Sequence, residues 1–178
     1  MDEARSLENL ALVGFMGTGK SSVGRLAAEY LRFTFLDTDE LIENETGQTI
    51  AEIFAKQGEA AFRKYERDVV HALSARRQTV IAAGGGLVTD PSNVASLKAH
   101  ALVVCLWASP ETIWERVRSQ THRPLLQTPD PQARIKELLE QRAPAYRQAD
   151  VLLHTGFRST KEVVQQVLHQ FNVARGGK

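Results

Sequence analysis

Five short apolar runs punctuate the chain, and polar or glycine-rich sequence separates them. In order they are LALVGF (10–15), FTFLD (33–37), TVIAAGG (79–85), ALVVCLW (101–107) and DVLLH (150–154). Each run is continuously apolar rather than alternating, as is typical of strands covered on both faces of a sheet. The pattern therefore predicts a five-stranded parallel sheet flanked by helices.

Helical periodicity fills the stretches between these runs. Apolar side chains recur at helical spacing at Val23, Leu26, Ala27, Tyr30 and Leu31, and again at Phe62, Tyr65, Val69 and Leu73. Ser109 and Pro110 suit an N-cap and a first helical position, and STKE (159–162) has the pattern of a capping box. Alternating strands and helices predict an α/β fold of three layers, with the sheet between two layers of helices.

Two stretches depart from this alternation. Residues 38–77 are almost entirely helical in pattern, whereas SQTHRPLLQTPDPQ (119–132) carries three prolines and little periodicity. A long irregular loop in a compact domain is often functional, so residues 119–131 are a candidate lid. NVARGGK (172–178) is expected to be a frayed tail, and residues 1–178 are expected to form a single domain.

Composition and charge argue against a nucleic-acid-binding, membrane-spanning or secreted protein. The 178 residues carry a net charge of +1, which gives no general attraction to nucleic acid or an anionic membrane. No apolar stretch has the length of a membrane span, and the polar start does not have the pattern of a secretory signal. Cys105 has no second cysteine to pair with and lies in an apolar run, so it is interpreted as a small buried side chain in a cytoplasmic protein.

GFMGTGKS (14–21) matches the phosphate-binding P-loop pattern G-x-x-x-x-G-K-[ST]. The match follows an apolar run and opens an amphipathic helix, which is the context that this motif requires. Glycines let the backbone direct several N–H groups at phosphate oxygens, and the helix N-terminus adds partial positive charge. Lys20 is expected to reach the outer phosphates and Ser21 to ligate Mg²⁺. The predicted nucleotide-binding residues here are Gly17, Thr18, Gly19, Lys20, Ser21 and Ser22.

The bound nucleotide is expected to be ATP. The sequence lacks the N-K-x-D motif with which GTPases recognise their base, and the chain is short for a motor. These absences favour a small-molecule kinase among the P-loop proteins.

LDTDE (36–40) places two carboxylates directly after the second apolar run. Asp37 and Asp39 would project the same way if the backbone is extended. Mg²⁺ could balance one charge, and the other carboxylate could accept a proton from an attacking hydroxyl. The alternative is a helix-capping cluster before ELIENE.

The glycine triplet Gly84, Gly85 and Gly86 follows the third run and is interpreted as part of a site. Ligands of a parallel α/β sheet bind beyond the carboxyl ends of the strands, and glycines let backbone approach a ligand closely. Arg63 and Glu66 are three residues apart on a helix. Taken alone, this spacing favours an ordinary surface pair.

Arg142 continues an apolar stripe of the segment RIKELLEQRAPAY (134–146). The stripe also contains Ile135, Leu138, Leu139 and Tyr146. An arginine on a buried face needs an anionic partner, such as the carboxylate of a small substrate, unless it snorkels past the core edge. Pro144 is expected to bend or end this helix.

The remaining polar candidates lie near the proline-bearing loop. Arg123 could close on the transferring phosphate, or it could be a solvated loop cation. Arg116 and Arg118 are ambiguous. The histidines His71, His100, His122, His154 and His169 show no metal-ligand spacing and are interpreted as structural or surface residues.

Taken together, GFMGTGKSS, DTD, FRKYE, GGG, RPLL and RAPAY occur in the order seen in shikimate kinases, and the resemblance covers about residues 8–170. It implies a nucleoside-monophosphate-kinase-like P-loop fold with a core over 8–37, a helical substrate-binding segment over about 38–77 and a closing lid. It also implies ATP-dependent phosphorylation of the 3-hydroxyl of shikimate, in chorismate and aromatic amino-acid biosynthesis.

The resemblance assigns roles by matching position. Asp37 would hold Mg²⁺ through water, Asp39 would bond the reacting hydroxyl, and Arg63, Gly85 and Arg142 would clamp shikimate. The expected nucleotide contacts are Arg123 in the lid, Arg118 against adenine and Arg158 in the loop HTGFRST. A monomer is expected. The rivals are a P-loop kinase of another small metabolite, such as gluconate, and a non-catalytic nucleotide-binding regulator.

Overall fold

The computed structural model describes residue 5 and residues 7–120 and 127–176. Its sheet contains the five predicted strands: β1 (Asn9–Val13), β2 (Thr34–Asp37), β3 (Thr79–Ala82), β4 (Ala101–Trp107) and β5 (Val151–His154). The strand order is β2-β3-β1-β4-β5, and every neighbouring pair is parallel. The predicted α/β fold with a parallel sheet is confirmed.

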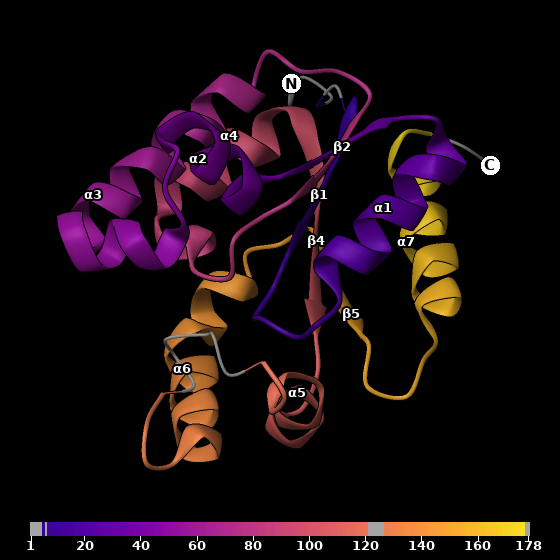
Figure 1. Ribbon diagram of the computed structural model, residues 1–178. Coiled ribbons are helices and arrows are strands. Elements are labelled where there is room, and N and C mark those ends of the chain that lie inside the picture. Colours follow the sequence, from indigo (N-terminus) through magenta and orange to yellow (C-terminus); the bar gives the residue numbers. More distant parts are fainter. Residues whose placement is uncertain (1–4, 6, 121–126, 177–178) are drawn as a thin grey trace.

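Helices cover both faces of the sheet (Figure 1). On one face lie α1 (Lys20–Leu31) and α7 (Thr160–Ala174), which pack on Leu10 and Leu12 of β1. The other face carries α2 (Thr38–Thr46), α3 (Ile50–Leu73), α4 (Pro91–His100), α5 (Pro110–Val117) and α6 (Pro131–Tyr146), over Ala11 and Val13. Alternate residues of β1 thus enter two cores, which explains why the run is apolar throughout.

The prediction of strands covered on both faces is right for the centre of the sheet and wrong for its edges. Every residue of β1 and β3 is buried, whereas β2 and β5 consist of half-exposed and exposed residues. The two edge strands lack a neighbour on one side, so their outer parts meet solvent. Tyr30 is a second correction, because it continues the helical stripe of α1 in sequence but is 63% exposed.

The predicted helix starts are confirmed. Ser109 caps α5 with Pro110 at the first helical position, and Ser159 and Glu162 form the capping box of α7. Pro144 does not end α6 directly, because the helix continues to Tyr146. The last helix runs to Ala174, two residues beyond the start of the segment that was expected to be frayed.

The predicted helical segment 38–77 consists of α2 and α3, which are separated by residues 47–49, and α3 ends at Leu73. Within α3, Gly58 has φ 82° and ψ 173°, so the helix is broken there and resumes at once. A short 3₁₀ turn, η1 (Leu87–Thr89), follows the glycine triplet. Residues 121–126 of the lid predicted at 119–131, including His122 and Arg123, lie outside the described residues.

Candidate active site

The P-loop forms the turn between β1 and α1. Gly17 and Gly19 have φ values of 74° and 95°, a left-handed conformation that favours glycine. A Cβ on Gly17 would also lie 2.6 Å from the side chain of Val117. Gly19 is the N-cap of α1 and offers no side chain to the first helical N–H groups. These amides therefore remain available to an anion at the helix N-terminus.

A cleft of about 460 Å³ opens at this end of the sheet. Its position beyond the carboxyl ends of the parallel strands is where α/β folds bind ligands. The lining combines P-loop backbone with three acidic side chains beyond Asp37 and with residues of α5 and the following turn. The lining residues are Met16, Gly17, Gly19, Lys20, Ser21, Ser22, Asp37, Asp39, Glu40, Glu43, Ala83, Gly84, Gly85, Arg116 and Gln120.

Lys20 and Thr18 differ in how they meet this cleft. Lys20 lines it, and its Nζ donates a hydrogen bond to the Phe15 carbonyl across the loop at 2.9 Å. Thr18 is buried, and its hydroxyl donates to that carbonyl at 2.8 Å. The Thr18 side chain therefore supports the shape of the loop, and its predicted contact with the nucleotide would have to come from the backbone.

Ser21 and Asp37 meet at the mouth of the P-loop. The Ser21 hydroxyl donates to Asp37 Oδ2 at 2.9 Å, and Asp37 Oδ1 accepts from the Asp39 amide at 3.0 Å. Asp37 is thus the N-cap of α2, so the capping interpretation is correct, and its second oxygen still points to Ser21. Two hard oxygen donors beside a phosphate-binding loop fit Mg²⁺. Within the described residues no group of three or more His, Cys, Asp or Glu forms a metal-binding cluster.

Asp39 lies against the first glycine of the triplet. A Cβ built on Gly84 would stand 2.5 Å from Asp39 Oδ1 and 3.3 Å from Glu66 Oε1. The Gly84 amide donates to Thr38 Oγ1 at 2.8 Å, so it is already engaged and does not face a ligand. Gly84 instead provides the space in which the two carboxylates approach the backbone.

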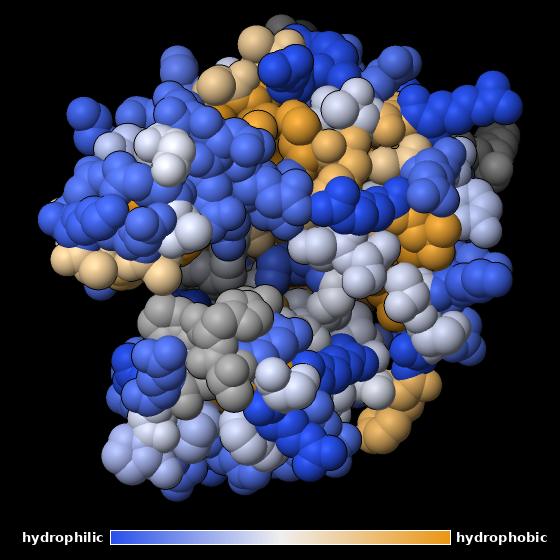
Figure 2. All heavy atoms as spheres, viewed as in Figure 1, coloured by the Kyte–Doolittle hydropathy of each residue, from blue (hydrophilic) through white to orange (hydrophobic). Residues whose placement is uncertain are grey.

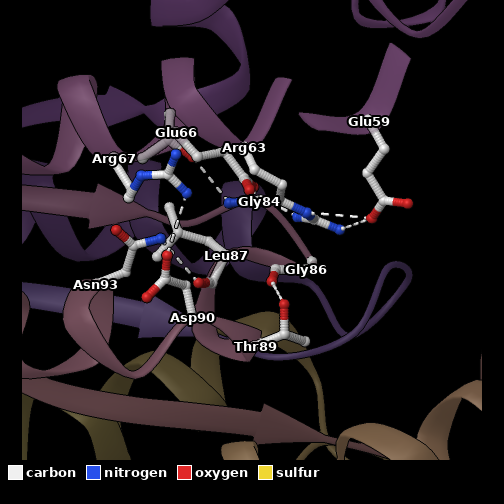
Figure 3. A network of polar contacts seen from close by, with 12 residues as sticks. Glu59, Arg63, Glu66, Arg67, Gly84, Gly86, Leu87, Thr89, Asp90 and Asn93 are labelled. Atoms are coloured by element: carbon white, nitrogen blue, oxygen red, sulfur yellow. Dashed lines mark hydrogen bonds and ion pairs between the residues drawn. The ribbon is translucent and has the colours of Figure 1, made fainter. Parts of the chain in front are cut away.

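Arg63 is the centre of an ion-pair network at the edge of this space (Figure 3). Its Nη1 lies 2.6 Å from Glu66 Oε2, and its Nη2 lies 2.9 Å from Glu59 Oε1. Glu66 is 1% exposed, so the ordinary surface pair favoured by the spacing is wrong. Burial raises the pKa of Glu66 above its ordinary value, and Asp39 adds to the rise while Arg63 opposes it. The guanidinium packs against Gly86, where a Cβ would meet Nη1 at 2.7 Å.

Arg142 reaches the second glycine of the triplet from α6. Its Nη1 donates to the Gly85 carbonyl at 3.3 Å, and the guanidinium lies 5.6 Å from the centre of the Phe15 ring. The Tyr146 hydroxyl donates to that same carbonyl at 2.7 Å, and burial raises the pKa of Tyr146 to about 12. The apolar stripe of α6 thus carries Arg142 to the glycine turn rather than out to solvent.

The triplet links these parts into one site. Gly85 lies beside the P-loop, since a Cβ there would be 3.5 Å from the Met16 amide. Arg63 and Arg142 do not line the 460 Å³ cleft themselves, but each contacts the turn that forms its wall. Hydrophilic residues dominate the surface over α2 and α3 on this side of the molecule (Figure 2).

Arg116, and not Arg118, is the arginine of this segment that lines the cleft. Its guanidinium donates to the Gly17 carbonyl at 3.2 Å and to the Thr155 carbonyl at 2.7 Å, and it lines the cleft. Arg118 caps the end of α5 and is exposed, away from that lining. Arg158 donates to the His154 carbonyl at 2.7 Å and lines a separate depression along α7.

Sequence reasoning missed several of these contacts. The burial of Glu66, the support that Tyr146 gives to Gly85 and the bridge from Arg116 to the P-loop all depend on partners distant in the chain. Tyr146 belonged to the apolar stripe, so the stripe indicated its burial but not its hydroxyl bond. Cys105 is buried as expected, and burial raises the pKa of its thiol to about 12.

A P-loop at a helix N-terminus, a Ser–Asp pair beside it and arginines across a glycine turn define a small-molecule kinase of the P-loop class. The shikimate kinase family model matches residues 16–172, so the chain belongs to the shikimate kinase family.

Individual relatives agree with this assignment. The chain is 43% identical to the shikimate kinase of Thermodesulfovibrio yellowstonii over 97% of this chain and 99% of the relative. It is 44% identical to that of Thermus thermophilus over 90% and 88% of the two chains. The solved structure of shikimate kinase from Acinetobacter baumannii in complex with shikimate superposes with a TM-score of 0.89, at 39% identity over 95% of both chains.

More distant structures share the fold alone. A gluconokinase from Sinorhizobium meliloti superposes with a TM-score of 0.60 at 18% identity over 97% and 96% of the two chains. No helix among the described residues is long and apolar enough to cross a membrane.

Proposed function

We propose that this protein transfers the γ-phosphoryl group of ATP to the 3-hydroxyl of shikimate, giving shikimate 3-phosphate and ADP. The observation that carries the proposal is the glycine triplet. One turn contacts Asp39 through Gly84, the P-loop and Arg142 through Gly85, and Arg63 through Gly86. A phosphate donor and a carboxylated acceptor can therefore share one site.

The donor half of the site binds the triphosphate. The first-turn amides of α1 and the Lys20 ammonium would hold its outer oxygens, with Gly17, Gly19 and Ser22 at the cleft wall. Ser21 and Asp37 would hold Mg²⁺, which supplies charge neutralisation on the phosphates when bound. Phosphoryl transfer needs alignment and charge stabilisation more than covalent help, and this arrangement provides both.

The acceptor half orients the substrate hydroxyl. Asp39 lies between the P-loop and Gly84, so its carboxylate can hold the attacking hydroxyl and take its proton. Asp39 Oδ1 is buried against Gly84, so the missing side chain of this glycine defines where the carboxylate oxygen lies. A base held in place beside the acceptor hydroxyl lowers the entropic cost of reaching the reactive geometry.

Arg63 and Arg142 would bind the substrate carboxylate. Both guanidinium groups contact the glycine turn from opposite elements, α3 and α6, so a carboxylate at the turn would meet two cations. The Gly85 and Gly86 backbone then lies within reach of the ring substituents of the substrate.

The remaining assignments extend this proposal. Arg123 would contact the transferring phosphoryl group from the lid over 119–131 and help to exclude water. Arg116, which the sequence left ambiguous, lines the cleft. The arginines predicted to bind the nucleotide, Arg118 and Arg158, would need to contact the base from its outer side. A monomer in the cytoplasm, acting in chorismate biosynthesis, completes the proposal.

A coupled assay of ADP release tests this function. Purified protein with ATP and Mg²⁺ should release ADP rapidly with shikimate and at background level with gluconate or nucleoside monophosphates. Turnover of gluconate in preference to shikimate would support the rival metabolite kinase. Nucleotide binding without turnover of any acceptor would support a regulator.

A further inference from the structure

The guanidinium of Arg63 is engaged before any substrate arrives. Glu59 Oε1 accepts from both Nε, at 3.2 Å, and Nη2, at 2.9 Å, along one edge of the group. Glu66 Oε2 accepts from Nη1 at 2.6 Å. The edge of Arg63 that could grip a carboxylate bidentately is thus occupied by a carboxylate of the protein itself (Figure 3).

The two glutamates differ in their freedom to leave. Glu66 is 1% exposed and cannot turn into solvent, whereas Glu59 is 65% exposed. Glu59 also directly follows Gly58, where the backbone of α3 leaves helical geometry. The Glu59 carboxylate can be rehydrated when it leaves, and ion pairs between residues four apart on a helix are weak, so the Glu59 bond costs little to break.

Charge in this network favours the departure of Glu59 when an anion binds. Arg63 and Arg142 contribute two cations at the glycine turn, where Glu66 and Asp39 contribute two carboxyl groups. Glu59 adds a third carboxyl group on the outer edge of Arg63. A substrate carboxylate adds another negative charge. Release of the exposed glutamate into water restores the balance that a buried carboxylate requires.

We propose that Glu59 is an internal competitor of the substrate: its carboxylate holds Arg63 in the unliganded protein, and the carboxylate of shikimate displaces it. The proposal rests on the proposed function, because it needs a carboxylated acceptor at Arg63. In this arrangement Glu59 raises the KM for shikimate, and it does not contact the phosphoryl group that is transferred. Glu66, which stays in place, keeps the guanidinium aligned while the exchange occurs.

Glu59→Gln tests the proposal because it removes the negative charge and keeps the size of the side chain. The KM for shikimate and the Kd from calorimetry should fall about two- to fivefold, the range set by a weak exposed ion pair. The KM for ATP and kcat should stay within about twofold, because Glu59 lies outside the phosphate-binding loop. Glu137→Gln is a matched control, since Glu137 forms a comparable exposed pair with Arg134 at 2.6 Å, and it should leave the shikimate KM unchanged.

The outcomes separate this inference from the function on which it rests. A raised shikimate KM in Glu59→Gln would mean that Glu59 orients Arg63 for the substrate, and an unchanged KM would mean that it does not compete. Either result overturns the inference while wild-type turnover of shikimate continues. Absence of shikimate-dependent turnover in the wild-type protein would instead overturn the proposed function.

Discussion

Adding one methyl group at Gly84 would separate the role of Asp39 from the stability of the fold. The φ of Gly84 lies outside the left-handed region, so alanine fits the backbone there without strain. The conflict is instead with two side chains, because the new Cβ would stand 2.5 Å from Asp39 Oδ1 and 3.3 Å from Glu66 Oε1. Gly84→Ala should therefore displace these two carboxylates and leave the backbone of the turn unchanged.

The size of the displacement sets the expected loss. Ordinary contact begins at 3.4 Å, so Asp39 Oδ1 must retreat by about 0.9 Å while Glu66 gives way only slightly. A misplacement of about 1 Å at a reacting group can cost on the order of a hundredfold in rate. We expect kcat with shikimate to fall by about that factor, with little change in the affinity for ATP.

Steady-state kinetics and thermal unfolding of three glycine variants provide the assay. Gly86→Ala adds the same methyl 2.7 Å from Nη1 of Arg63, and should raise the shikimate KM more than it lowers kcat. Gly47→Ala faces open space at φ 65°, so it should cost about 1–2 kcal/mol of stability and leave activity intact. A Gly84→Ala enzyme that is folded and turns over at the wild-type rate would refute the positioning of Asp39 by this turn.

Three further changes test separate parts of the account. Asp39→Asn should lower kcat about a hundredfold or more with ATP affinity retained, and near-normal turnover would contradict its role as base. Arg142→Lys should weaken shikimate binding in calorimetry, because the planar fork is lost, and an unchanged Kd would count against the clamp. Burial lowers the pKa of His100, and the Asn9 amide donates to its Nδ1 at 2.9 Å, as a neutral ring requires. As the pH falls, His100 of the unfolded chain is protonated before His100 of the folded protein. The contribution of the neutral ring to the free energy of unfolding is therefore complete above pH 6.5 and is lost progressively below it. In urea unfolding, His100→Asn should lose less stability than the wild type between neutral and acidic pH.

The parts of the molecule that depend on neighbours in sequence could be predicted. The strands of the central sheet and the P-loop each arise from a short run whose pattern predicts its own element. The extended backbone considered for Asp37 and Asp39 does not form, because α2 begins at Thr38. The glycine triplet was predictable as part of a site because it follows a strand of a parallel sheet. The caps at Ser109 and Ser159 needed only local hydrogen bonds.

The parts that depend on distant contacts could not be predicted. An Arg–Glu pair three residues apart looks the same on a surface as in a core, and the burial of Glu66 follows from packing around Gly84. Which of Arg116 and Arg118 reaches the cleft depends on Thr155, which follows the neighbouring strand β5 and lies 39 residues further along the chain.

The central claim is that Arg63 and Arg142 hold a substrate carboxylate against the glycine turn beside the bound triphosphate. Its most direct test compares kcat/KM for shikimate with that for its neutral methyl ester, in the wild type and in Arg142→Lys. The account predicts that the wild type prefers the acid by about a hundredfold or more, as expected when buried charged groups lose their partner, and that the preference shrinks in the variant. Equal use of acid and ester by the wild-type enzyme would contradict it.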